Sequence, residues 1–458
     1  MSVVVERPRR RATGIALLVI ALLATLLGYA LQSLGLDDAL PANLGVTALL
    51  VTTVAVGGWL AVRFMARGAD PVLYPTTVAL AGIGLVMLFR IMNGRGHPEI
   101  AQEQAVWVAV GIACFAAVLA VVRDIRQLDA FTYTIGLAGL VLLLLPIVPG
   151  LGQEINGARL WVSVGAISFQ PAEFGRILIV IFLASYLAQH REMLATGVGR
   201  LGLPRVKDLG PLLLAWGTSL VILFVERDLG ASLLLFGIFI VMIWMATGRT
   251  SYLVIGVLLF AAGAYLGWLT LPHIQERVAA WLHALDPDMV EGAGYQLAQG
   301  WFALATGGMV GAGLGLGSPT LIPYVGSDFI LAAFGEELGM LGVAALLLLY
   351  LVLIGRGLRV AIERQDPFES LLATGLTTLI ALQVFVIAGG VLRLIPLTGV
   401  PLPLVSYGGT SRVATFVTIA LLVRLSAGPW ARGRAGGPGA QGGSERRRAN
   451  VAPGSGGN

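Results

Sequence analysis

The chain consists of long apolar runs separated by short polar segments. Each run is about 20 residues long, the length that an α-helix needs to cross a bilayer, whereas the strands of a membrane barrel are shorter and alternate in polarity. We therefore predict an all-α fold, a polytopic membrane helix bundle with about twelve transmembrane helices. The predicted spans are 14–35, 43–63, 73–92, 104–122, 130–149, 171–190, 211–227, 229–247, 252–271, 329–355, 370–395 and 406–427.

The composition supports a membrane protein and narrows the function. Of the residues, 57% are hydrophobic and 12% are charged, whereas a soluble domain carries about 25% charged residues. The single cysteine, Cys114, excludes an internal disulfide and a cysteine-rich metal site. The net charge of +5 is compatible with a nucleic-acid partner. However, the arginines lie in short loops and tails, where they set topology, so no nucleic-acid partner is predicted.

Arginine residues are distributed unevenly between alternate loops of this topology. The loops on one side, together with the C-terminal tail, hold most of them, and such loops face the cytoplasm in membrane proteins. The protein is therefore predicted to lie in a cytoplasmic membrane with both termini inside. Three segments then face outward: 150–170, 272–328 and 396–405.

Both ends of the chain are polar and basic. Residues 1–13 precede an apolar run, as in a signal peptide, but the run is long and no clear small-residue cleavage site follows. We therefore expect a cytoplasmic basic N-terminus at 1–13 and an uncleaved transmembrane pair within 14–66. Residues 428–458 are rich in Gly, Pro, Ser and Arg and are predicted to form a disordered cytoplasmic tail.

The longest polar stretch between two spans is the predicted large extracellular loop 272–328. Within it, 274–285 carries apolar residues at helical spacing, which predicts an amphipathic helix lying on the outer leaflet. The run 307–319 holds too many glycines for a stable helix, so a flexible or re-entrant connection is expected. No Gly-Lys-Ser/Thr follows this run, which excludes a phosphate-binding P-loop.

Three acids lie where this loop returns to an apolar segment: Asp328, Glu336 and Glu337. Acids at a membrane boundary are destabilising and are usually retained for function, so Asp328 is the candidate catalytic residue. Glu336 lies about two helical turns further on and shares its face, whereas Glu337 is offset by about 100°. The structural alternative is that Asp328 caps the helix and the glutamates face other helices.

Two further acids lie on the outward side. Glu173 is in the first turn of the helix that Pro171 begins, and it can pair with Arg176 three residues on. Asp228 lies in a short turn directly against the next apolar run, where it is expected to face a cavity. The structural alternatives are a salt bridge that only orders the loop and an ordinary loop charge.

The segment 393–412 combines prolines and glycines with several hydroxyl groups, among them that of Ser406. Its backbone amides and the side chain of Arg393 suit anion binding. The alternative is a rigid turn between helices. Elsewhere, the four histidines lack ligand spacing and no nucleotide-binding or Gly-x-Ser-x-Gly motif is present, so an ATP-driven pump is not expected.

In six short stretches of sequence, the chain resembles the shape, elongation, division and sporulation (SEDS) family of bacterial envelope proteins. The stretches run in family order across 73–427, and Pro-Leu-Thr-Gly at 396–399 is similar to the rod-shape-determining branch. Division-branch members usually carry a lysine where Thr398 stands. The six are NGARLW (156–161), QPAEFGR (170–176), ERDLG (226–230), YQLAQG (295–300), SDFILAAFGEELG (327–339) and PLPLVSYGGTS (401–411).

The chain departs from the family pattern in two places. The family core has ten spans, which correspond to 67–427 here, so 14–63 resembles an N-terminal addition of two helices. The usual His-Thr-Asp is Gly-Ser-Asp at 326–328, which keeps the acid and removes a neighbouring imidazole.

The resemblance implies a peptidoglycan glycosyltransferase. Such an enzyme polymerises lipid II into β-1,4 glycan strands at the outer face of the bacterial cytoplasmic membrane during cell elongation. The family's essential aspartate corresponds to Asp328, and its cavity residues correspond to Glu173, Arg176 and Asp228. The implied partner is a class B penicillin-binding transpeptidase.

A mechanism follows as a hypothesis. An inverting displacement of a diphosphate needs one base for the acceptor hydroxyl, and partial burial would raise the pKa of Asp328 from its usual value of about 3.9. Arg159 and Arg393 are candidates to offset the diphosphate charge, and a divalent cation, Mg²⁺ or Mn²⁺, is a further candidate. Glu336 and Ser406 complete the predicted substrate-binding set.

Three alternatives stay open at this point. A lipid II flippase also has polar groups within its spans, but it needs a polar path to both faces, and here the polar groups gather outside. A division-branch polymerase differs in role rather than in chemistry. A noncatalytic scaffold for the transpeptidase would tolerate Asp328→Asn.

Overall fold

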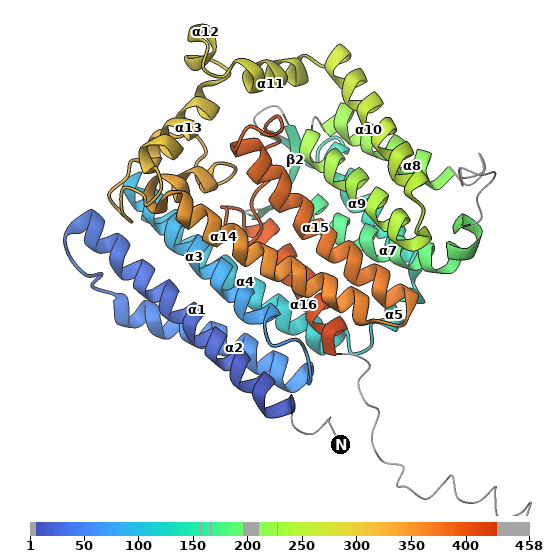
Figure 1. The fold of residues 1–458 in the computed structure, drawn as a ribbon, viewed down its shortest axis with the longest axis horizontal. Coiled ribbons are helices and arrows are strands. Elements are labelled where there is room, and N and C mark those ends of the chain that lie inside the picture. The colour runs from blue at the N-terminus through green and yellow to red at the C-terminus, as the bar shows by residue number, and fades with distance from the viewer. Residues whose placement is uncertain (1–5, 156–157, 165–166, 196–209, 227, 428–458) are drawn as a thin grey trace, which may run out of the picture. The chain divides into compact units, whose positions relative to one another are not determined.

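The computed structural model describes residues 6–155, 158–164, 167–195, 210–226 and 228–427 (Figure 1). Within them, ten helices are long and apolar enough to cross a membrane. The predicted membrane helix bundle is therefore confirmed. The ten are α1 (Glu6–Asp37), α2 (Leu44–Met65), α3 (Leu73–Gly94), α4 (Pro98–Val121), α7 (Pro171–Ala195), α9 (Leu229–Thr247), α10 (Thr250–Thr270), α14 (Ile330–Glu363), α15 (Pro367–Val391) and α16 (Gly409–Ala427).

Two shorter helices account for the remaining predicted spans. The segment 130–149 forms α6 (Thr132–Leu144), which ends in the 3₁₀ turn η1 (Leu145–Ile147). The segment 211–227 forms α8 (Gly210–Val221), which continues into the short π-helix η3 (Ile222–Glu226). The short helix α5 (Arg126–Asp129) lies in the loop before α6.

Local chemistry sets several of the helix boundaries. Pro98, Pro171 and Pro367 begin α4, α7 and α15, where a missing amide hydrogen does no harm. Asp366 caps α15, because its Oδ1 accepts hydrogen bonds from the Phe368 and Glu369 amides at 3.0 and 3.2 Å.

The helices differ in how far they are covered by others. In α3, 89% of the apolar stretch is buried by other parts of the protein, whereas only 17% is buried in α2 and in α10. Thus α3 lies at the centre of the bundle, together with α15 and α16, whereas α2 lies along its edge beside α1 (Figure 1). Helix α1 packs lengthwise on α3, and α2 packs on α4.

A small antiparallel sheet precedes α7. This sheet was not predicted from the sequence. It consists of β1 (Gly152–Ile155), β2 (Ala158–Val164) and β3 (Ile167–Phe169) in that order. Val162 of β2 is opposite Gly152 of β1 and Phe169 of β3. Residues 156 and 157, which begin the NGARLW stretch, lie outside the described residues, as does the tail 428–458.

The loop 272–328 is more helical than its sequence suggests. The predicted amphipathic helix is confirmed as α11 (Pro272–His283), followed by α12 (Pro287–Val290) and α13 (Tyr295–Gly307). In Figure 1, α11 and α12 lie at the edge of the molecule opposite the start of α1. A 3₁₀ turn, η4 (Pro319–Leu321), then leads to α14.

The glycine-rich loop 308–318 is not a free connection. The amides of Ala312 and Gly313 donate to the carbonyls of Glu336 and Glu337 at 2.9 and 3.0 Å. Helix α14 is interrupted at Gly339, whose φ of 67° is accessible to glycine. Beyond the break, the Met340 amide donates to the Gly308 carbonyl at 2.9 Å, so the loop and the broken helix satisfy each other's backbone groups.

Candidate functional site

Asp328 lies in the turn directly before α14 and is half-buried. Ser327 Oγ donates to Asp328 Oδ1 at 2.7 Å. Burial raises the pKa of the Asp328 carboxyl; the Ser327 hydroxyl, the Gln296 amide and the charge of Arg277 partly oppose this rise. Among the described residues, no cation lies within ion-pair distance of Asp328. The result is a carboxyl that is more basic than a free aspartate.

The turn that carries Asp328 is held by the loop before α16. Ser406 Oγ donates to the Ser327 carbonyl, and the Tyr407 amide donates to the Gly326 carbonyl at 2.7 Å. Ser406 is 3% exposed, and its Oγ also accepts from the Leu402 amide at 2.9 Å. In this structure Ser406, predicted to bind substrate, fixes the position of the Asp328 turn.

Arg277 of α11 belongs to this site, although it is not among the site residues predicted from the sequence. Its Nη1 donates to the carbonyls of Leu397 and Thr398 at 3.3 and 3.2 Å. Its charge also favours the ionised form of Asp328. Arg277 therefore connects the amphipathic helix, the loop 392–408 and the candidate base. The signal that was available in the sequence is the position of a cation on the polar side of an amphipathic helix.

A second charged cluster forms where α7 and α9 begin. The predicted pair is present: Arg176 Nη1 donates to Glu173 Oε1 at 2.9 Å, and both side chains are buried. Glu226, at the end of η3, is 1% exposed, and no described residue is a hydrogen-bond partner for its Oε1. Arg176 and Asp228 both interact electrostatically with Glu226. Glu226 thus joins the three predicted residues.

Asp228 also caps α9, because its Oδ1 accepts from the Ala231 amide at 2.8 Å. A Cβ atom placed on Gly230 would lie 3.3 Å from both Asp228 Oδ1 and the Thr398 carbonyl oxygen. That carbonyl accepts the hydrogen bond from Arg277. The loop 392–408 therefore borders both the Asp228 cluster and the surroundings of Asp328.

The other two predicted arginines have different environments. Arg393 donates from Nε to the Trp281 carbonyl at 2.7 Å, and its guanidinium lies 4.6 Å from the centre of the Trp301 ring. Trp281 Nε1 donates back to the Arg393 carbonyl at 3.0 Å, so Arg393 joins α11 and α13 to the loop before α16. Arg159 is exposed on β2.

Glu336 and Glu337 face the glycine-rich loop 308–318. Glu337 is fully buried and pairs with Arg90 of α3, whose Nε lies 2.7 Å from Glu337 Oε1. Glu336 Oε1 accepts from the Ser318 amide at 2.7 Å. Both glutamates thus order the loop that leads to Asp328. In the part of the chain that the structure describes, no group of three His, Cys, Asp or Glu residues is arranged to hold a metal ion.

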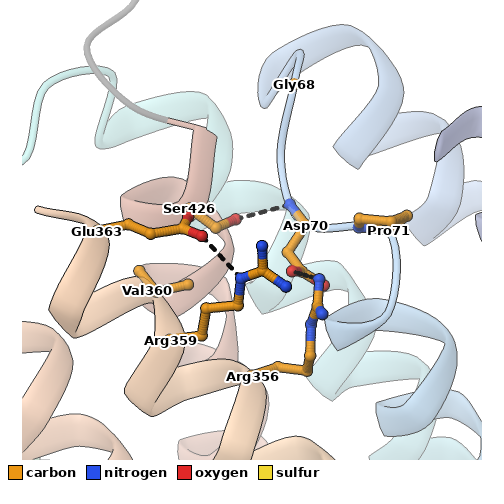
Figure 2. A pocket seen from close by; sticks show the side chains of 8 residues that line it. All are labelled: Gly68, Asp70, Pro71, Arg356, Arg359, Val360, Glu363 and Ser426. Carbon is orange, nitrogen blue, oxygen red and sulfur yellow. Dashed lines mark hydrogen bonds and ion pairs between the residues drawn. The ribbon is translucent and has the colours of Figure 1, made fainter. Parts of the chain in front are cut away.

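The opposite end of the bundle contains charged residues that pair with one another. Arg356 of α14 pairs with Asp70, and Arg359 pairs with Glu363 at 2.7 Å, around a small pocket (Figure 2). Gly68, Pro71, Val360 and Ser426 complete the lining of this pocket.

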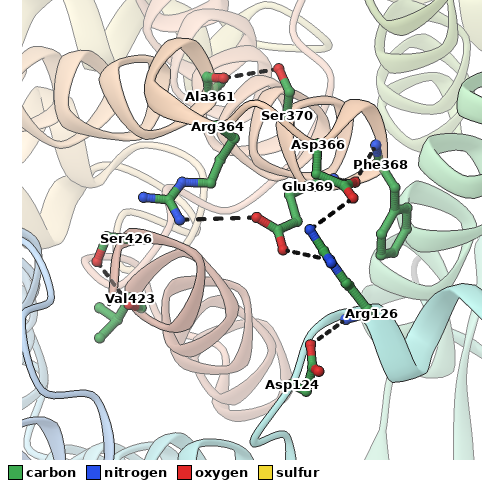
Figure 3. Close-up of polar contacts among 10 residues, drawn as sticks. All are labelled: Asp124, Arg126, Ala361, Arg364, Asp366, Phe368, Glu369, Ser370, Val423 and Ser426. Carbon is green, nitrogen blue, oxygen red and sulfur yellow. Dashed lines mark hydrogen bonds and ion pairs between the residues drawn. The ribbon is translucent and has the colours of Figure 1, made fainter. Parts of the chain in front are cut away.

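A second group of ion pairs lies beside this pocket. Arg126 lies 3.2 Å from Asp366 and 3.4 Å from Glu369, and Arg364 lies 3.9 Å from the other oxygen of Glu369 (Figure 3). Arg424, near the end of α16, donates to the Met65 carbonyl at 2.7 Å. Loop and helix ends are thus fastened together by charges at this end.

Comparisons with known proteins agree with one another. The family model for cell cycle proteins of the FtsW, RodA and SpoVE type matches residues 71–428. The chain is 43% identical over 432 residues to peptidoglycan glycosyltransferase RodA of Mycobacterium tuberculosis strain H37Rv, covering 92% of this chain and 91% of that protein. It is 32% identical over 368 residues to a probable peptidoglycan glycosyltransferase FtsW of Geobacter metallireducens, covering 78% and 94%.

Two solved structures are similar as well. One belongs to a study of the structural coordination of polymerization and crosslinking by a peptidoglycan synthase complex. Its TM-score is 0.64 at 27% identity, covering 80% of this chain and 99% of that one. The other is the rod shape determining protein RodA of Thermus thermophilus, with a TM-score of 0.57 at 25% identity, covering 79% and 97%.

Proposed function

The chain belongs to the FtsW, RodA and SpoVE family of cell cycle proteins, and on that premise we propose that it polymerises lipid II with Asp328 as the base. It is a peptidoglycan glycosyltransferase, as are its relatives at 43% identity. One observation carries the proposal for Asp328. This half-buried carboxyl has a raised pKa, and no described cation neutralises it in an ion pair.

The reaction is a single displacement. The 4-hydroxyl oxygen of the acceptor sugar attacks the anomeric carbon of the donor, and the bond from that carbon to the diphosphate breaks. The diphosphate leaves with the electron pair, the hydroxyl proton passes to the Asp328 carboxylate, and the α-link becomes a β-1,4 link. Base catalysis of this kind contributes about 10²–10⁴ in rate, most when the pKa of the base approaches the working pH.

The charge of the diphosphates must be offset during the reaction. Arg277, which already acts on Asp328, and Arg159 on the outer sheet are the proposed cations. We place Glu173, Arg176, Glu226 and Asp228 in the substrate-binding region, since the loop 392–408 borders both clusters. Glu336, Ser406 and Arg393 contribute by holding the loops around this region.

A divalent cation, Mg²⁺ or Mn²⁺, is part of the proposal. Mg²⁺ is commonly bound by one or two carboxylates together with substrate phosphates, so it does not require a cluster of three protein ligands. Asp228 is the carboxylate proposed to take part, which leaves Asp328 free to act as the base. When bound, the ion would neutralise diphosphate charge.

The orientation and the partner follow from separate observations. The start of α1 and the end of α16 lie at the same end of the bundle: a Cβ on Gly14 would lie 3.2 Å from the Pro71 carbonyl oxygen, and the Asp70 amide donates to Ser426 Oγ at 3.0 Å. Since this end holds many of the arginines, we place both termini in the cytoplasm of a bacterium and the Asp328 end outside.

The similar structure from a peptidoglycan synthase complex concerns polymerization together with crosslinking. This supports a class B penicillin-binding transpeptidase as the partner in the membrane. Higher identity to RodA relatives, 43% against 32% for an FtsW relative, supports a role in cell elongation over division. A flippase is disfavoured, because the described charges at the Arg356 end pair with one another.

The decisive experiment supplies labelled lipid II to the purified chain in detergent, alone and with a candidate transpeptidase. Wild type is expected to yield glycan polymer on a gel, and Asp328→Asn is expected to lose at least about 100-fold of that activity. Asp288→Asn is the matched control, since Asp288 is an exposed acid of the same outer loop.

Two results would overturn parts of the proposal. No polymer from folded wild type with any partner or cation would remove the lipid II assignment. Equal polymer from wild type and Asp328→Asn would remove Asp328 as the base and direct attention to Glu226 and Asp228. The same reaction run with EDTA, then with Mg²⁺ or Mn²⁺ restored, tests the divalent cation.

A further inference from the structure

We propose that α1 is a positioning element of the glycosyltransferase, which seats the glycine-rich loop 308–318 through a backbone contact between Gly35 and Gly315. This inference rests on the proposed function and concerns a part of the chain outside the matched family model, which begins at residue 71. The M. tuberculosis relative covers 92% of the chain, so its similarity reaches into the first 70 residues. At least part of the N-terminal region that precedes the family model is therefore shared with this relative.

The contact between α1 and the loop requires glycine on both sides. A Cβ atom on Gly35 would collide with the Leu314 carbonyl oxygen and lie 3.0 Å from the Gly315 Cα. A Cβ atom on Gly315 would lie 2.8 Å from the Gln32 carbonyl oxygen. Gly315 also has a φ of +91°, which other residues rarely adopt. Two backbones thus meet directly at the end of α1 near the candidate site.

From Gly315 the contact continues into the core. The Gly315 amide donates to Glu337 Oε2 at 3.0 Å, and Glu337 pairs with Arg90 at 2.7 Å. Arg90 Nη2 donates to the Gly317 carbonyl at 2.8 Å. Because Glu337 is fully buried, a displaced loop would leave its charge with one partner fewer in an apolar environment. The position of the loop and this ion pair are therefore coupled.

The same loop leads directly into the turn of the candidate base. After Ser318, whose amide binds Glu336, the chain passes through η4 and reaches Asp328. This connecting segment is held at two points. Arg95 Nη2 donates to the Ile322 carbonyl at 2.8 Å, and Gln296 Nε2 donates to the Pro323 carbonyl at 3.0 Å. A shift of the loop at Gly315 would thus pull on the segment that sets where Asp328 lies.

Helix α1 is well suited to act as a support. It packs closely on α3, where a Cβ at Gly82 would collide with Thr25 and one at Gly28 would lie 3.3 Å from Val86. Gln32, one turn before Gly35, is 1% exposed, and no described residue is a partner for its Oε1. A buried amide in a membrane span is unfavourable. Its backbone carbonyl lies beside Gly315, so this end of α1 contacts the glycine-rich loop.

The test compares Gly35→Leu with Gly57→Leu in the full chain. Gly57 lies in α2 and is exposed, and a Cβ there meets nothing within 4 Å. With labelled lipid II, Gly35→Leu is expected to lower kcat about 10- to 100-fold, because small displacements of reacting groups are costly. Its KM should stay within about twofold, since the substrate-binding residues are untouched. Gly57→Leu is expected to match wild type in both constants.

The outcomes separate this inference from the proposed function. An inactive, folded wild type would overturn the proposed function and this inference with it. An active wild type with an equally active Gly35→Leu would overturn this inference alone. A raised KM with unchanged kcat would also overturn it, since that pattern indicates a binding role.

If Gly35→Leu does not fold, Gly35→Ala replaces it, because a single Cβ already collides with Leu314. Folded Gly35→Ala is expected to lose about tenfold in kcat. Full activity in that variant, at an unchanged melting temperature, would count against α1 as a positioning element.

Discussion

At the end of the bundle where α16 finishes, arginines and acids form ion pairs with one another, whereas at the end where α14 begins, Asp328 and Glu226 do not. Asp70, Asp366 and Glu369 each have an arginine within ion-pair distance. No described cation lies that close to Asp328 or to Glu226.

The difference separates two uses of charge in a membrane protein. Paired charges at helix ends join loops and helices, and their pairing keeps them ionised at little net change in free energy. An acid that is buried without a pair destabilises the fold and is a candidate for function. Asp328 and Glu226, which have no described arginine within ion-pair distance, are therefore stronger candidates for chemistry than the paired acids at the other end.

The pH dependence of activity is the strongest test of this comparison. A base works in its deprotonated form, so kcat/KM should be full above the pKa of Asp328 and fall about tenfold per pH unit below it. Because burial raises this pKa, the fall should begin above pH ~4, the ordinary value for aspartate. A pH series of polymer formation measures it.

The Ser327 hydroxyl provides the internal check on that profile. It donates to Asp328 Oδ1 and lowers the pKa, so Ser327→Ala should move the acid limb to higher pH. An acid limb at or below pH 4 in wild type, or one that Ser327→Ala leaves in place, would contradict Asp328 as the titrating group.

Replacing one arginine by alanine at each end should give the next largest difference in kcat/KM. Arg277→Ala removes the cation that acts on Asp328 and two hydrogen bonds to the loop 392–408, so kcat/KM should fall about tenfold. Arg359→Ala, at the opposite end, removes an exposed pair with Glu363 and should leave kcat/KM unchanged. Equal losses of kcat/KM in the two variants would contradict a functional difference between the two ends.

The smallest effect is expected at the paired end itself. Glu369→Gln leaves both Arg126 and Arg364 without this carboxylate and should destabilise the protein by about 1–2 kcal/mol, with polymer formation unchanged. A thermal melt in detergent measures this. Glu363→Gln is the control, because its pair with Arg359 is exposed and should matter less. A loss of activity in Glu369→Gln at unchanged melting temperature would place function at this end.

The membrane helices could be predicted from the sequence, and Asp328 could be singled out as a candidate catalytic residue. Apolar runs of bilayer length mark the spans, and Asp328 is conspicuous because it stands at the start of one. The small sheet was missed, because its strands are short and lie in a segment that reads as a loop. The glycine-rich loop was expected to be a flexible or re-entrant connection, and the backbone hydrogen bonds that hold it to α14 could not be predicted.

The surroundings of Asp328 could not be predicted, because they depend on contacts between distant segments. Arg277 reaches the site by donating to backbone carbonyls of the loop 392–408, and backbone acceptors carry no mark in a sequence. Ser406 is predicted to bind substrate, and its hydrogen bond to the Ser327 carbonyl could not be predicted, because this acceptor is also a backbone group. Glu226 stands two residues before Asp228 in a short turn, and only its burial distinguishes it.

The break at Gly339 has a mechanical consequence. It divides α14 into a short outer piece, which follows Asp328 and is fastened to the glycine-rich loop, and a long piece that crosses the bilayer. Long apolar helices tilt when the membrane becomes thinner or thicker. We expect the break at Gly339 to take up part of such tilting, so that Asp328 moves less than the long piece when the thickness of the lipid changes.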